Sequence, residues 1–157
     1  MAKIKPLSVL LTGASIVGAF TVLSKAINNI SHNIKLQVPL SSIKLKFNGL
    51  QSILVSFSLV CQNNYKITYR ITDLNSSIFY RNTEGELVQL VSTPPTKLAY
   101  KLSAKATTKI EDITIAVDGF SVVQAVKSAL TRPKGERFLL KITCNINNIP
   151  YSEDTWY

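Results

Sequence analysis

Residues 53–71 read ILVSFSLVCQNNYKITYRI, and this stretch decides the fold. Apolar side chains occupy every second position over 53–61 and again over 65–71, and Asn63-Asn64 lies between the two runs. A period of two is typical of half-buried β-strands, and asparagine is a preferred turn residue. The stretch therefore predicts two strands joined by a turn.

The same alternation continues on both sides of this stretch. Upstream it predicts a strand that breaks at Pro39 and ends at Asn48-Gly49, a strong hairpin turn. The predicted strands are 34–47, 53–61, 65–72, 78–80 with a continuation at 87–91, 98–104, 113–117 and 138–146.

Residues 120–130 follow a different period. Phe120, Val123, Val126 and Leu130 recur at spacings of three and four, which predicts a short amphipathic helix. Asp118 precedes this run and can cap its first turn. About seven strands and one helix, without an internal repeat, predict a mainly β fold: an antiparallel sandwich over residues 34–157.

The first 33 residues are of a different kind. No charged residue lies between Lys5 and Lys25, and these nineteen residues approach the ~20 that a helix needs to cross a bilayer. We expect residues 1–33 to form an apolar anchor helix followed by a polar stalk. Ala14 and Gly18, four positions apart, would let a second helix pack closely. The expected anchor side chains are Leu7, Val9, Leu10, Leu11, Ile16, Val17, Phe20, Val22 and Leu23.

Three interpretations of this N-terminal segment stay open. Its length and basic flanks favour a membrane-spanning helix. Its basic start and apolar middle also fit a cleaved secretory signal, although the cleavage site after Ala26 is a poor one. A length near the bilayer limit is equally compatible with a helix buried in a protein assembly, and Ser, Thr and Gly residues make the segment only moderately hydrophobic.

Composition narrows the class of protein. Of 157 residues, 46% are hydrophobic and 17% are charged, which excludes a largely disordered chain. Two cysteines and one histidine exclude a disulfide scaffold and a His-rich metal site. Carboxylate pairs such as Glu84 and Glu86 lie in polar turns, where no burial separates two pKa values for acid–base catalysis. We therefore expect no enzyme activity, no metal and no cofactor.

The two cysteines fall on inward faces of predicted strands. We expect Cys61 and Cys144 to be buried free thiols, because cysteine behaves as a small hydrophobic residue. The alternative is a disulfide across the sandwich, which would need facing Cα atoms about 4.4–6.8 Å apart.

The net charge of +9 comes from 18 Lys and Arg against 9 Asp and Glu. Lys97, Lys101, Lys105 and Lys109 recur at every fourth position, so in one extended strand they would share a face. Such lysines can simply discourage edge pairing, or they can bind an anionic partner, of which lipid headgroups fit best beside a membrane helix. Nucleic acid is not expected, because exposed aromatic residues do not alternate with the lysines.

The residues 151–157 read YSEDTWY. Trp and Tyr are typical interface anchors, so Trp156 and Tyr157 either dock a partner or cap the end of the sandwich.

Three stretches resemble the late embryogenesis abundant type-2 domain, also called the WHy (water stress and hypersensitive response) domain. SILVSFSLVCQNNY (52–65) is similar to that family's apolar strand and Asn-Pro-Asn turn, with Asn64 in place of the proline. LSAKATTKIEDITIAVDG (102–119) and LLKITCNINNIPYSEDTWY (139–157) are similar to two of its later strands. The resemblance implies an immunoglobulin-like β-sandwich with one helix near its end, and it implies no catalytic residues.

We therefore expect a non-enzymatic structural or interaction module, which residues 1–33 anchor to membrane lipid or to other subunits as a homo- or hetero-oligomer. The alternative is a structural protein of a virus particle, in particular a phage, such as a minor capsid, membrane-associated, portal or tail component. Either would be membrane-associated or lie within a virus particle. A lipid or small-molecule carrier is a third class, which only the apolar core supports, so a small-molecule ligand is not expected.

Overall fold

The computed structural model describes residue 25, residues 28–49 and residues 51–157, and these divide into two compact units, 1–32 and 33–157. In the first unit the described residues are helical. The predicted anchor residues and the pair Ala14 and Gly18 lie outside the described residues. Among the helices that are described, none is long and apolar enough to cross a membrane.

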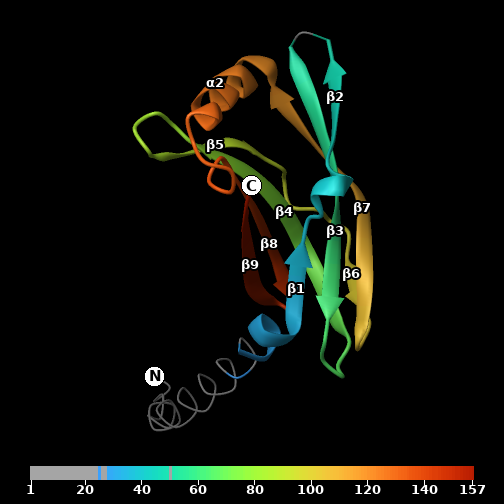
Figure 1. Cartoon of the computed structure of the whole chain (residues 1–157). Coiled ribbons are helices and arrows are strands. Elements are labelled where there is room, and N and C mark those ends of the chain that lie inside the picture. The colour runs from blue at the N-terminus through green and yellow to red at the C-terminus, as the bar shows by residue number, and fades with distance from the viewer. Residues whose placement is uncertain (1–24, 26–27, 50) are drawn as a thin grey trace, which may run out of the picture. The chain divides into compact units, whose positions relative to one another are not determined.

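The second unit is mainly β and consists of two antiparallel sheets (Figure 1). In chain order its elements are β1 (Ile34–Gln37), the 3₁₀ helix η1 (Leu40–Ser42), β2 (Lys44–Asn48), β3 (Ser52–Asn63), β4 (Tyr69–Arg81), β5 (Leu87–Ser92), β6 (Tyr100–Leu102), β7 (Ala106–Asp118), α2 (Gly119–Leu130), β8 (Phe138–Ile146) and β9 (Ile149–Trp156). The predicted mainly β, antiparallel fold is thus confirmed for the described part of the chain.

Each sheet has one long central strand. In the first sheet, β7 pairs along one edge of β3, and the other edge is divided between β1, opposite residues 60–63, and β2, opposite residues 52–56. In the second sheet, β4 pairs with β8 on one side and with β5 and β6 on the other, and β9 pairs with β8. The two ends of β3 therefore lie at opposite ends of the domain.

The core lies between the sheets and is built by both central strands. Leu59 and Cys61 of β3, Ile71 of β4, Leu102 of β6 and Ile146 of β8 have no exposed surface. Full burial of each aliphatic side chain stabilises the fold by about 1.5–3 kcal/mol.

The predicted strands 65–72 and 78–80 belong to one 13-residue strand, β4, which begins at Tyr69 and not at Tyr65. The pairing of β4 with β8 shifts between Thr72 and Asn75, and Asp73 at this bulge has a φ of 54°. A bulge adds a residue and changes the phase of the alternation, so one strand resembles two in the sequence.

Helix α2 confirms the predicted helix and its cap. The Asp118 carboxylate accepts a hydrogen bond from the Ser121 N–H at 2.9 Å. The apolar stripe, however, does not face the core: Phe120 is 73% exposed, and the buried residues of the helix are Ala125 and Ala129. The small alanines form its packing face, because they allow the helix to approach the sheets closely.

Candidate binding surfaces at the two ends of the sandwich

One end of the domain is formed by residues 64–68, 103–105 and 147–148, and we call it the basic end. The side chain of Asn63, which is only 1% exposed, forms hydrogen bonds with the loops of this end. Its side-chain amide donates to the carbonyl oxygens of Ile67, Leu102 and Ser103 at 2.8, 3.2 and 3.1 Å, and its Oδ1 accepts from the Tyr65 N–H at 3.0 Å. The predicted turn residue is therefore also a buried polar anchor, which the periodicity did not reveal.

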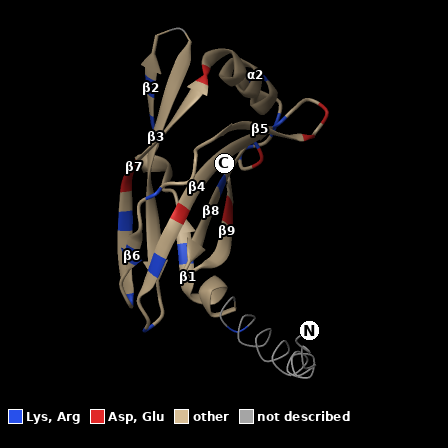
Figure 2. Ribbon diagram, turned by 180° about the vertical axis from the view of Figure 1, so that it is seen from behind, with Lys and Arg blue, Asp and Glu red and all other residues tan. Residues whose placement is uncertain are grey.

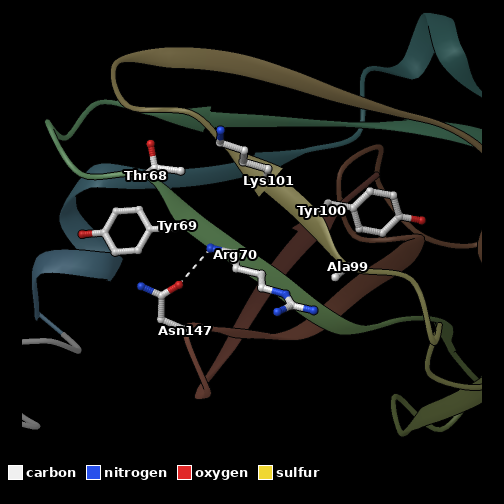
Figure 3. A pocket seen from close by; sticks show the side chains of 7 residues that line it. All are labelled: Thr68, Tyr69, Arg70, Ala99, Tyr100, Lys101 and Asn147. Atoms are coloured by element: carbon white, nitrogen blue, oxygen red, sulfur yellow. Dashed lines mark hydrogen bonds between the residues drawn. The ribbon is translucent and has the colours of Figure 1, made fainter.

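A shallow depression of about 440 Å³ opens at the basic end (Figure 3). Arg70 of β4 lies directly opposite Lys101 of β6 in the strand register, and both side chains are exposed. The Arg70 N–H donates to Oδ1 of Asn147, from the turn between β8 and β9, at 2.8 Å. The depression is lined by Thr68, Tyr69, Arg70, Ala99, Tyr100, Lys101 and Asn147.

The lining of this depression contains two cations and no carboxylate. Like charges directly opposite each other on neighbouring strands are destabilising. Among the described residues the ion pair is Lys109–Glu111, so neither Arg70 nor Lys101 has an acidic partner there. The uncompensated pair makes this surface a candidate for binding an anion.

The four lysines predicted to share one strand face do not do so. Lys101 lies in β6 and Lys109 in β7, while Lys105 occupies the turn between these strands with a φ of 50°. The chain reverses at this turn, so the regular spacing does not run along one strand. Lys97 precedes β6, and Lys109 pairs with Glu111 at 2.6 Å. Figure 2 shows the positions of the charged residues on the strands.

At the opposite end an apolar groove of about 300 Å³ opens between the sheets. Its lining comes from η1, β2, β3, β4, β5, β7, α2 and β8, together with Ile43 and Tyr157. The polar group of its lining is the Tyr157 hydroxyl, which donates to the Val38 carbonyl at 2.8 Å. The lining residues are Leu40, Ile43, Leu45, Ile53, Val55, Phe57, Ile78, Leu90, Val117, Val122, Val126, Phe138, Leu140 and Tyr157.

Large apolar side chains are exposed on η1, β2 and α2, three of the elements that contribute to the lining of this groove. Leu45 of β2 is 63% exposed and Phe47 is 73% exposed, although their alternation predicted a half-buried strand. The reason is the position of β2, an edge strand that pairs with β3 alone among the described strands and has no buried residue. We call the following set the apolar rim: Leu40, Leu45, Phe47, Phe120, Val123, Val126 and Leu130.

The two aromatic residues at positions 156 and 157 have different surroundings. The Arg81 guanidinium lies over the partly exposed Trp156 ring, 5.1 Å from its centroid. The Tyr157 N–H donates to the Phe138 carbonyl at 2.8 Å, and the Tyr157 ring lines the groove. Tyr157 thus caps this end of the sandwich, and Trp156 presents part of its surface to solvent.

Both cysteines are buried and free, as predicted. Burial raises the pKa of the Cys61 and Cys144 thiols to about 12. Neither thiol is therefore a nucleophile at neutral pH, since the thiolate is the reactive form. No group of three or more metal-ligating side chains occurs in the part of the chain that the structure describes.

No family model and no curated protein matches the chain. Among solved structures, a protein from Archaeoglobus fulgidus is similar with a TM-score of 0.42 and 6% identity, over 79% of this chain and 93% of that one. The solution structure of AT1g01470 from Arabidopsis thaliana is similar with a TM-score of 0.42 and 18% identity, over 76% of this chain and 79% of that one.

Proposed function

We propose that the chain is a non-enzymatic interaction module, a WHy-like, immunoglobulin-like β-sandwich that residues 6–24 hold to a membrane or a large assembly. The observation that carries the proposal is the open apolar end of the domain. Soluble monomers rarely expose a large contiguous apolar patch, and such patches mark interaction sites. Here seven large apolar side chains are exposed on η1, β2 and α2, and three of them, Leu40, Leu45 and Val126, line a groove that is itself apolar.

The attachment point supports the same function. The chain enters the sandwich at Ile34, which lies opposite Asn63 at the basic end. The groove reaches Ile53, ten residues away along β3, a distance of about 33 Å for an extended strand. A domain anchored at one end therefore keeps its apolar groove at the other end, available to a partner.

The charge of the basic end favours a membrane with anionic headgroups as the surface to which the chain is anchored. Arg70 and Lys101 lie opposite each other in the register of β4 and β6 and both are exposed, so an anionic surface at this end would meet two cations. Each basic residue near an anionic membrane adds about 1 kcal/mol of attraction. Headgroups beside the entry point would thus reinforce an apolar anchor in the bilayer.

The test compares two lysine substitutions in the anchor of the full-length chain. V17K places a charge in the middle of the apolar stretch, whereas S24K adds the same charge at its end, beside Lys25. Flotation with phosphatidylcholine–phosphatidylglycerol vesicles and sedimentation without them would be measured for both. We expect V17K to be free and monomeric in both assays and S24K to behave as the wild type. A V17K chain that stays bound would contradict the proposal.

A further inference from the structure

The groove with its rim is an open apolar surface, and residues 6–24 are an uncharged and largely apolar stretch of sequence. We propose that the groove receives residues 6–24 of a second copy, so that copies associate head to tail. This inference rests on the proposed function. Of the two attachments proposed there, a membrane or a large assembly, it chooses an assembly of copies of this chain.

The chemistry of the two surfaces matches. The groove is about twice the volume of the engineered ~150 Å³ apolar cavity that holds one benzene, so it has room for about two or three apolar side chains. The segment 6–24 supplies such side chains without any charge. Its Ser, Thr and Gly residues weaken its partition into lipid, whereas a protein groove open to water on one side tolerates them.

The place where the segment joins the sandwich favours a second copy over the same chain. Residues 25–33 connect them, and residues 28–33 are helical, so the connection spans at most about 20 Å. Phe57, at the near edge of the groove, lies six residues along β3 from Asn63, about 20 Å away. A chain that folded back could reach this edge only with its connection stretched to full length along the sandwich, whereas a second copy can approach the groove from any direction.

The edge strand β2 offers a further means of holding the segment. Within the described part of the chain it pairs with β3 alone, and its Leu45 lines the groove. A free strand edge can pair with an added segment through main-chain hydrogen bonds, while the side chains of that segment enter neighbouring pockets. Head-to-tail contacts of this kind are heterologous and extend into open chains or close into rings.

The test joins one cysteine in the segment to one cysteine in the groove. Full-length V17C and L45C, one of them tagged, are co-expressed and treated with a short bismaleimide. Cys61 and Cys144 should not react with the bismaleimide, because both are buried. The matched control replaces L45C with K66C, which is also an exposed position but lies at the basic end. We expect the V17C–L45C pair to give several-fold more mixed dimer than the control pair.

Other outcomes would overturn the inference. A double variant V17C/L45C that links within one chain, with no mixed dimer, would place the segment in its own groove. Absence of any link, with V17C shielded from a water-soluble maleimide only when phosphatidylcholine vesicles are added, would place it in a bilayer. That outcome leaves the proposed function intact. A V17C thiol that is accessible under all conditions would overturn both.

A second experiment fills the groove with a large side chain and leaves the sequence of residues 6–24 unchanged. V126W and Q124W place the same side chain at exposed positions of α2, but Val126 lines the groove, whereas Gln124 belongs neither to its lining nor to the apolar rim. We expect sedimentation to show a several-fold weaker association for V126W and wild-type association for Q124W. Equal association of the two variants would contradict docking in the groove.

Discussion

The two halves of β3 carry similar sequences and have different surroundings. From Phe57 to Asn63, every second residue is buried beneath the second sheet. From Ile53 to Val55 the same alternation is only half-buried, and β2 beside it is exposed throughout. Alternation therefore states which residues share a face, whereas burial depends on whether another element covers that face.

The largest expected difference in stability is between a substitution in the covered half of β3 and one at the open end of the domain. L59A removes a side chain with no exposed surface, and we expect the free energy of unfolding to fall by about 4 kcal/mol. L45A removes the same atoms from the rim, where the side chain is mostly exposed, and the loss should be about 0.5 kcal/mol or less. Urea unfolding of both variants measures the difference. Equal losses would mean that the groove is covered in solution.

The next effect concerns the polar anchor of the basic end. N63A leaves three buried or partly buried carbonyls without their donor, so we expect a loss of about 3 kcal/mol. Its neighbour Asn64 is exposed, and N64A should cost about 0.5 kcal/mol or less. The same urea titration compares them. A small loss in N63A would show that the loops of this end are held by other contacts.

Alkaline pH should lower the stability of the folded domain through its two buried thiols. Burial raises the pKa of Cys61 and Cys144 from 9.0 to about 12, so the folded state holds protons that the unfolded state releases. This stability is complete below pH 9 and is lost as the pH rises from 9 to 12. We expect the melting temperature to fall between pH 9 and pH 10, and to fall less in C61A/C144A. Equal slopes would exclude the thiols as the cause.

The smallest effect tests the charge repulsion at the basic end. K101E replaces a like-charge pair with an opposite-charge pair beside Arg70, and we expect a gain of about 0.5 kcal/mol at low salt. K97E makes the same change of charge at an exposed position outside the strands and should be neutral. The gain should shrink as salt is added. Destabilisation by K101E would show that Arg70 and Lys101 do not repel each other.

The sequence predicted the type and the pairing sense of the elements better than their extent. Its period of two and its turn residues depend on neighbouring residues, so strands, hairpins and the Asp118 cap were predictable. Bulges were not, because the extra residue at Asp73 resembles a turn. The exposure of Phe47 and Phe120 was not predictable either, since it depends on which element lies opposite. Of the candidate sites, the lysine pattern predicted basic character, but the pairing of Lys101 with Arg70 required the fold.

The pairing of β3 with β7 has a consequence for the order of folding. Ser52 pairs with Asp118, 66 residues later in the sequence, whereas β8 and β9 are joined by the two residues Asn147 and Asn148. Closing a long loop costs more entropy and is slower than forming a hairpin. The β8–β9 hairpin should thus form before either sheet is complete, because the second sheet also needs a distant pairing, that of Ile71 with Ile146, 75 residues later. The groove needs walls from both sheets, so a neighbouring copy can engage only a chain that has finished folding.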